Sequence, residues 1–309
     1  MFGINNGSLG GAGGRFMGTH YSGPFIAISA GACHFIALKA DHSVVVFGED
    51  EWGQWGQRDV PRGIGPVALI AAGALHSVVV TENGTVHCWG CDDDGQCTVP
   101  LRLSEFGAIN AISAGASHTV ALTDKGTVVC WGSNTFGQCD VPSNLGPVVE
   151  ISAGDFHTVA RSADGRVRCW GCDKFGQCGT PRKFNSVASI SAGGAITVLL
   201  ESNGTTVIRG HAAYWGWTAD GVCPVPRNIG TCVAISAGAL HTAALLKDGS
   251  LVYIGYCNAG MCTFASGLTN VIAISAGDFF TVALMIDGSI VRVEFNEPGT
   301  DPDYGVSLN

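Results

Sequence analysis

The chain has 309 residues, a formal net charge of −9 and 45 glycines, and only 13% of its residues are charged. A negative charge without clustered lysine or arginine argues against a nucleic-acid surface, because binding to phosphates relies on basic side chains. No apolar run approaches the roughly 20 residues that cross a bilayer, so we expect no membrane segment. The composition is typical of one large all-β domain with many short strands and tight turns.

The first 24 residues are a Gly-rich segment that lacks the basic and apolar regions of a signal peptide. The 13 cysteines favour an oxidising compartment, although their odd number leaves at least one thiol unpaired. The two observations point in opposite directions. We therefore leave the localisation unknown, with an intracellular location slightly favoured.

A unit of about 39 residues builds residues 25–295. Each unit has three short apolar or alternating runs with a tight turn such as Asp164-Gly165 between the second and third, as in an antiparallel sheet. The motif I-S-A-G-x-x-H opens each unit and places its glycines at Gly31, Gly73, Gly115, Gly154, Gly193, Gly238 and Gly277. Seven repeats of this period predict a seven-bladed β-propeller with three-stranded blades.

A second landmark, an aromatic residue followed by glycine, suggests how the ring closes. The landmark is missing from the seventh repeat, which has Val293-Glu294, while an extra copy stands at Phe2-Gly3. We therefore expect residues 1–24 to supply a closing strand to the last blade, which leaves no free sheet edge. The fifth repeat is longer than its neighbours, and residues 296–309 form a polar tail.

The repeated residues resemble those of the regulator of chromosome condensation superfamily. The patterns A-G-x-x-H-T-x-A-L and D-G-x-V-x-x-W-G-x-N-x-x-G-Q are well kept in AGASHTVALTDKGTVVCWGSNTFGQCDVP, residues 114–142. The short period and the G-Q-x-x-x-P ending are most similar to the β-lactamase-inhibitory propeller branch, whose blades have three strands. The resemblance implies the fold and leaves function open, because this scaffold hosts nucleotide exchange, enzyme inhibition, light sensing and receptor ectodomains.

Five histidines share one repeat position, and three tryptophans share another. A ring of metal ligands is one interpretation of the histidines, but ligands spread around seven blades would not converge, so we expect them to hydrogen-bond backbone in the adjoining turn. We expect the tryptophans to pack between blades. The residues are His34, His76, His118, His157 and His241, and Trp89, Trp131 and Trp170.

Three cysteine pairs span the same loop, from the residue before tryptophan to the residue after glutamine. Each pair is a possible disulfide: Cys88 with Cys97, Cys130 with Cys139, and Cys169 with Cys178. The first repeat loses both thiols, and we place Val46 and Trp55 at these positions.

The loop between aromatic-Gly and Gly-Gln varies most between repeats, as expected of a binding rim on a fixed frame. Aromatic anchors with acidic neighbours suggest a protein partner with a basic patch. The alternative, that these are ordinary turn residues with the aromatic rings folded back on the blades, has equal weight. The candidate partner-binding residues are Asp50, Trp52, Asp93, Asp94, Phe136, Asp173, Phe175, Tyr214, Trp217 and Asp220.

The sequence therefore favours a non-enzymatic, monomeric propeller that binds a protein through one rim, as an inhibitor or adaptor, without a cofactor or metal. No blade carries a nucleophile with a neighbouring base, or a metal cluster. The alternative function is guanine-nucleotide exchange on a Ran-like GTPase, since Asp155 resembles an acidic position in that branch. The branch's inserted β-wedge needs a long extra segment. It has no counterpart in this sequence, because the largest insertion, in the fifth repeat, is six residues.

Overall fold

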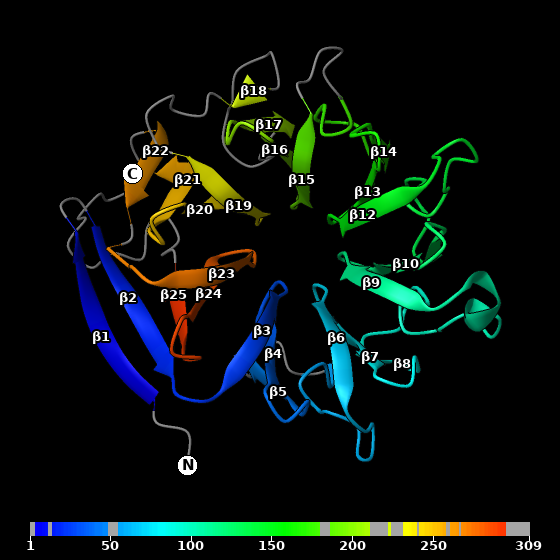
Figure 1. The fold of residues 1–309 in the computed structure, drawn as a ribbon, viewed down its shortest axis with the longest axis horizontal. Coiled ribbons are helices and arrows are strands. Elements are labelled where there is room, and N and C mark those ends of the chain that lie inside the picture. Colours follow the sequence, from blue (N-terminus) through cyan, green and yellow to red (C-terminus); the bar gives the residue numbers. More distant parts are fainter. Residues whose placement is uncertain are drawn as a thin grey trace, which may run out of the picture.

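A computed structural model of the chain describes residues 4–11, 14–48, 55–179, 186–210, 222–223, 231–239, 241–257, 260–265 and 267–294. The described strands form seven antiparallel sheets arranged around a central axis, as a β-propeller (Figure 1). The predicted fold class is confirmed. Within the described residues, no helix has the length and apolar character needed to span a bilayer.

Each sheet is one blade, and its strands follow one another outward from the axis. Blades 1 to 4 have three strands each: β3 (Phe25–Ala30), β4 (His34–Lys39) and β5 (Val44–Gly48); β6 (Val67–Ala72), β7 (His76–Thr81) and β8 (Val86–Gly90); β9 (Ile109–Ala114), β10 (His118–Thr123) and β11 (Val128–Gly132); β12 (Val148–Ala153), β13 (His157–Ser162) and β14 (Val167–Gly171). A 3-10 helix over Leu103–Phe106 lies between blades 2 and 3.

The remaining blades have additional strands. Blade 5 contains β15 (Val187–Ala192), β16 (Ile196–Glu201), β17 (Thr206–Gly210) and β18 (Val222–Cys223); blade 6 contains β19 (Cys232–Ala237), β20 (His241–Leu246), β21 (Leu251–Cys257) and β22 (Gly260–Ala265); blade 7 contains β23 (Val271–Ala276), β24 (Phe280–Met285) and β25 (Ile290–Glu294), extended by β2 (Gly14–Tyr21) and β1 (Ile4–Gly11).

The fourth strands of blades 5 and 6 depart from the predicted three. In blades 2 to 4, a buried glutamine after glycine holds the loop that follows the third strand. Val222 and Met261 stand at that position in blades 5 and 6, and β18 and β22 run through them. Because these residues have no side-chain amide to accept a loop N–H, the chain satisfies its backbone by pairing as a strand.

The middle strand of each blade is largely buried, since neighbouring sheets cover both of its faces. All six residues of β7, β10 and β16 are buried. The core therefore lies between blades, and the cluster that joins Phe35 of blade 1 to Val282 and Ile290 of blade 7 closes it.

The N-terminal segment pairs with the last blade. β2 runs antiparallel to β25, with Gly18 opposite Val293 and Tyr21 opposite Ile290. The first and last thirds of the chain are thereby joined in one sheet, and β1 forms its outer edge (Figure 1).

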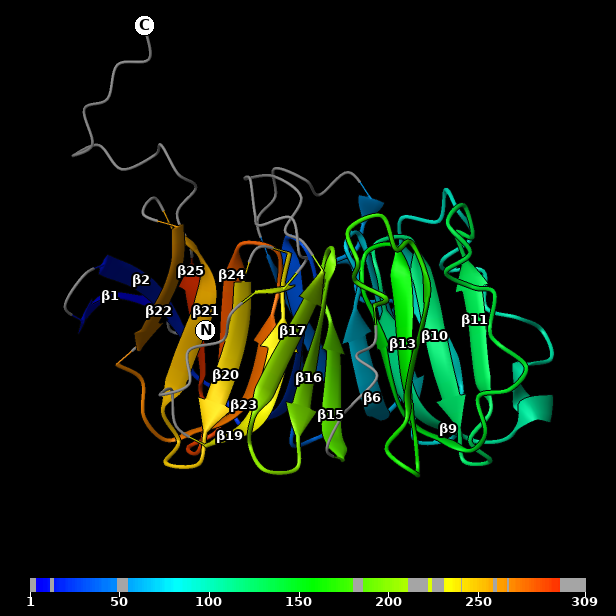
Figure 2. The ribbon, with the colours of Figure 1, turned by 90° about the horizontal axis from the view of Figure 1, so that it is seen from above.

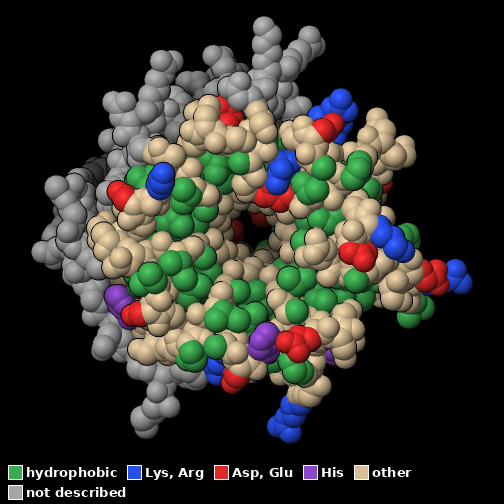
Figure 3. Space-filling model, viewed as in Figure 1, with side chains coloured by type: hydrophobic (Ala, Val, Ile, Leu, Met, Phe, Trp, Pro, Cys, Tyr) green, Lys and Arg blue, Asp and Glu red, His purple; other side chains and the backbone are tan. Residues whose placement is uncertain are grey.

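All turns fall on two faces, because the strands of every blade run roughly along the axis (Figure 2). The turns between first and second strands and the loops after third strands share one face, which we call the loop face; backbone bonds from Cys91 N to Leu75 O and from Cys172 N to Phe156 O join them. The turns between second and third strands form the opposite, hairpin face. Figure 3 shows the hairpin face, where hydrophobic side chains surround the central opening.

Candidate functional site

The loops of blades 2, 3 and 4 on the loop face have one geometry. The first polar residue of each loop accepts the backbone N–H of the residue five positions on: Asp92 from Cys97 at 2.7 Å, Asn134 from Cys139 at 2.8 Å and Asp173 from Cys178 at 2.8 Å. These contacts are turn chemistry of the kind that asparagine and aspartate favour. One carboxylate oxygen of Asp173 is therefore committed to its own loop.

A buried glutamine then fixes each loop to the next blade. Gln138 is 1% exposed, and its side-chain oxygen accepts the N–H of Phe136 at 2.9 Å. Its main-chain oxygen accepts the indole N–H of Trp170 at 2.9 Å. The equivalent bonds tie Gln96 to Trp131 and Gln57 to Trp89. The tryptophans lie between blades as predicted, and they also hold the rim in place.

The candidate partner-binding residues that the structure describes differ in solvent exposure. Phe136 is 49% exposed, Asp93, Asp94 and Asp173 are exposed, and Phe175 is half-buried with the Lys174 ammonium 6.0 Å from its ring centroid. The remaining candidates, Asp50, Trp52, Tyr214, Trp217 and Asp220, lie outside the described residues.

An aromatic pair joins the rim to the central turns. The rings of Phe136 in blade 3 and Phe156 in blade 4 meet edge to face with 5.3 Å between centroids, and Phe156 is 43% exposed. Phe279, the equivalent residue of blade 7, is also 43% exposed. Aromatic surface on this face therefore extends from the rim toward the axis.

The five histidines form a ring of hydrogen bonds, and the partner of each Nε2 is a side chain where backbone was predicted. Each Nε2 reaches a hydroxyl in the next blade: His34 to Ser77 at 3.0 Å, His76 to Thr119 at 3.0 Å, His118 to Thr158 at 3.0 Å, His157 to Thr197 at 2.9 Å and His241 to Thr281 at 2.7 Å. His241 also has the predicted kind of backbone contact, to Asp278 in the turn of blade 7. Thr158 donates its proton to Gln138 O, so His118 must donate from Nε2.

This arrangement keeps the rings neutral. His118 Nδ1 is buried without a hydrogen-bond partner, and burial lowers the pKa of His118 to about 4 and that of His157 to about 3. The histidines are structural. Within the described residues, no group of three or more His, Cys, Asp or Glu side chains is placed to hold a metal ion.

The seven motif glycines line a narrow central channel. A Cβ added to Gly154 would collide with the carbonyl oxygen of Gly193 in the next blade, and the same relationship runs around the ring to Gly277, whose added Cβ would collide with the oxygen of Gly31. The cavity along the axis measures about 60 Å³, room for a few water molecules. Its walls are mostly alanine and glycine.

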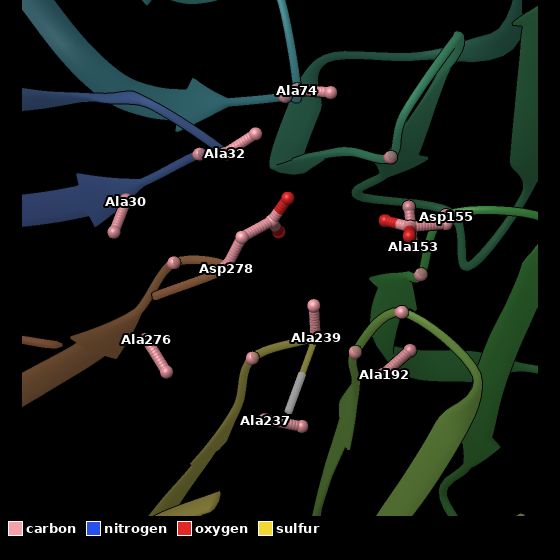
Figure 4. A pocket seen from close by; sticks show the side chains of 18 of the residues that line it. Ala30, Ala32, Ala74, Ala153, Asp155, Ala192, Ala237, Ala239, Ala276 and Asp278 are labelled. Atoms are coloured by element: carbon pink, nitrogen blue, oxygen red, sulfur yellow. The ribbon is translucent and has the colours of Figure 1, made fainter. Parts of the chain in front are cut away.

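Two carboxylates interrupt these apolar walls. Asp155 of blade 4 and Asp278 of blade 7 point into the cavity from different sides (Figure 4). Burial raises the pKa of both, and the charge of Asp155 adds to the effect on Asp278, whose pKa reaches about 7. Sequence reasoning noted Asp155 alone; the repeated spelling A-G-D-F at 153–156 and 276–279 was the available signal for the pair.

Two of the three cysteine pairs are bonded. Disulfides join Cys130 to Cys139 and Cys169 to Cys178, with Cα atoms 5.1 Å and 4.9 Å apart. The sulfurs of Cys88 and Cys97 lie 2.6 Å apart, closer than two separate thiols approach, so this pair is also placed to bond. In blade 1, the buried glutamine is Gln57, so Arg58, and not Trp55, takes the second cysteine position; Trp55 is 43% exposed.

Comparison with known families identifies the repeat. The model of the regulator of chromosome condensation (RCC1) repeat matches residues 67–96, 109–138 and 148–177, from blades 2, 3 and 4. The chain is a β-propeller in which blades 2, 3 and 4 carry RCC1 repeats. A comparison with curated protein sequences found no match.

Solved structures share the fold of this propeller. Human WBSCR16 has a TM-score of 0.67 at 16% identity, over 90% of this chain and 88% of the other. Prp20p of Saccharomyces cerevisiae has a TM-score of 0.67 at 19% identity, over 89% of this chain and 83% of Prp20p. The ectodomain of the Arabidopsis thaliana receptor kinase ACR4 has a TM-score of 0.66 at 20% identity, over 86% of this chain and 93% of the ectodomain. These identities support the architecture only.

Proposed function

We propose that this propeller is a non-enzymatic binding module that takes a protein partner on its loop face. The observation that carries the proposal is the exposed pair of Phe136 and Phe156, which bridges blades 3 and 4 on the face that also carries the exposed acidic loop of Asp93 and Asp94 in blade 2. Aromatic side chains held by a rigid frame provide contact area at low entropic cost, and they dominate many interfaces.

Charge and rigidity support the same proposal. The exposed carboxylates of the rim, together with the net charge of −9, favour a partner with a basic patch and raise its rate of encounter. The glutamine bonds fix the loops before binding, so little ordering is required when a partner docks. A structural relative, Prp20p, is described with binding properties to Gsp1p and histones, which supports a protein partner in general.

Affinity capture from the native cell tests the proposal. The double variant Phe136→Ala, Phe156→Ala should lose at least tenfold of the captured partner, because truncating two aromatic anchors removes more than about 1.4 kcal/mol. Ile286→Ala is the matched control, since Ile286 is 71% exposed on the hairpin face. Equal capture by all three proteins would contradict binding through the loop face.

Guanine-nucleotide exchange is the second candidate, favoured by the position of Asp155 at the loop-face end of blade 4. Release of labelled GDP from a Ran-like GTPase should accelerate with wild-type propeller and not with Asp155→Asn. No acceleration at saturating propeller would remove this candidate.

A further inference from the structure

The central channel holds two ionisable groups that the rim does not use. Asp155 is half-buried, and no side chain of the described residues donates a hydrogen bond to its carboxylate. One of its oxygens lies over Gly194 of blade 5, where an added Cβ would come within 3.2 Å of it. The carboxylate thus lies against the backbone of a residue that has no side chain, and it faces the cavity.

Asp278 completes the site from the other side of the channel. Both carboxylates point into the cavity, whose other lining residues are alanine and glycine (Figure 4). Each belongs to a turn on the loop face and is followed directly by an exposed phenylalanine, Phe156 or Phe279. The cavity therefore opens beside the aromatic surface of the proposed binding face.

Two changes would relieve the electrostatics of this site: protonation of a carboxylate or the entry of a counter-charge. Two carboxylates that share a small space with apolar walls repel each other, and neither has a cation beside it within the channel lining. The Cys33 thiol of blade 1 lies near Asp278, and its pKa is raised by burial and, to a smaller extent, by the charge of Asp278, while the Arg58 guanidinium acts on the same thiol in the opposite direction. A cation that entered would form charge-assisted hydrogen bonds with both carboxylates.

The dimensions select the kind of cation. A cavity of about 60 Å³ accommodates one narrow chain and no folded element. Alanine and glycine walls suit an aliphatic stem, while the carboxylates suit a charged head, which is the division found in lysine and arginine. Within the described residues, no third His, Cys, Asp or Glu joins the pair to complete a metal site.

We propose that the channel mouth is a socket for one basic side chain of the protein partner, whose cationic head lies between Asp155 and Asp278 while Phe156 and Phe279 flank its entry. This inference rests on the proposed function and adds the chemistry of the contact. The rim then provides area, and the socket provides selectivity for a lysine or arginine at one position of the partner.

The first test uses n-butylammonium as a probe of the socket alone. Protein labelled with ¹³C at the aspartate carboxyl carbons is titrated at a pH of about 8, where Asp278 is mainly ionised. The signals of Asp155 and Asp278, assigned from Asp155→Asn and Asp278→Asn, should shift saturably. Either variant should weaken binding at least fivefold, whereas Asp164→Asn on the hairpin face should leave it unchanged.

Two other cations complete this test. Tetramethylammonium has no N–H donor and should bind at least tenfold more weakly than n-butylammonium. Magnesium chloride at equal ionic strength should not compete. Tighter binding of magnesium than of the amine, or no saturable shift with the amine, would overturn the socket.

The second test uses the captured partner. Asp155→Asn with Asp278→Asn should weaken capture at least tenfold while Phe136 and Phe156 remain intact. Binding of the amine together with unchanged partner affinity would overturn the inference and leave the proposed function standing. Loss of capture in the phenylalanine variant alone supports the rim and overturns the socket.

Discussion

His118 Nε2 lies 3.0 Å from Thr158 Oγ1 in the next blade, and the hydroxyl of Thr158 donates in turn to the main-chain oxygen of Gln138 at 2.8 Å. The same carbonyl oxygen accepts the indole N–H of Trp170. The relay thus connects the middle strand of blade 3, the middle and outer strands of blade 4, and the rim loop of blade 3. Its members are buried, so each unmade bond carries a desolvation penalty.

Thr158→Val should therefore destabilise the propeller by about 1–3 kcal/mol, because it leaves the His118 N–H without an acceptor. The shift in the midpoint of urea unfolding measures this loss of stability, provided that the dependence of the unfolding free energy on urea concentration is the same in variant and wild type. Thr135→Val, the same change on a loop residue, should alter stability by less than about 0.5 kcal/mol. An equal effect of the two changes would show that the relay contributes nothing specific.

The histidine ring should make the fold sensitive to mild acid. Burial lowers the pKa of His76, His157 and His241 to about 3, whereas an unfolded histidine has 6.5. The unfolded chain therefore binds protons first, so the stabilisation is complete above pH 6.5 and declines as the pH falls toward the folded values.

By a pH of about 5, each buried ring should cost on the order of 1–2 kcal/mol. Thermal unfolding measured between pH values of about 8 and 5 should show a falling midpoint. His87→Gln, outside the ring, is the control and should keep the profile. A flat profile for the wild type would contradict neutral buried rings.

Asp278 should produce the opposite dependence. Its folded pKa of about 7 exceeds the unfolded value of 3.8, so its contribution is complete below the unfolded value and is lost as the pH rises through 7. Asp278→Asn should therefore stabilise the protein at a pH of about 8 and have little effect near 4. The difference in unfolding midpoint between variant and wild type, plotted against pH, measures it. A difference independent of pH would show that the pKa of Asp278 is the same in the folded and unfolded chain, and would contradict its elevation by the channel.

The two disulfides can be counted by alkylation. Unfolded protein, prepared without reductant under oxidising conditions, should take up at least four fewer alkyl groups than reduced protein through Cys130–Cys139 and Cys169–Cys178. Cys139→Ser should then lower stability by about 2–3 kcal/mol under oxidising conditions only. Cys33→Ser, which removes a thiol outside the three pairs, is the control. Equal uptake by oxidised and reduced protein would contradict both disulfides.

The fold and the position of the rim loops could be predicted from the sequence, because the length of the repeat and its turn residues are visible within short stretches of chain. The partner of each histidine was not accessible, since His118 and Thr158 are 40 residues apart and meet only through the stagger of neighbouring blades. The same limit hid the channel pair: Asp155 and Asp278 come together because blade 7 returns to blade 1.

Two further differences have local causes that a single sequence leaves ambiguous. Blade 1 offers two Gly-Gln pairs, and only burial shows that Gln57 is the one that caps the loop. In blade 7, Phe280 replaces the histidine and Phe35 of blade 1 replaces the threonine, with 6.4 Å between ring centroids. Both polar partners are exchanged together, which explains why an apolar residue is tolerated there.

The sharing of one sheet by both ends of the chain determines how the molecule would respond to a pulling force. Ile4 of β1 pairs with Tyr21, whereas Glu294 follows Val293, which pairs with Gly18. Tension applied between Ile4 and Glu294 would load the β1–β2 ladder at its Ile4 end, then β2–β25 at its Gly18 end. Because β1 and β25 run parallel and are pulled from opposite ends, the tension acts along the strands in shear, so several residue pairs share the load at once and blade 7 resists opening.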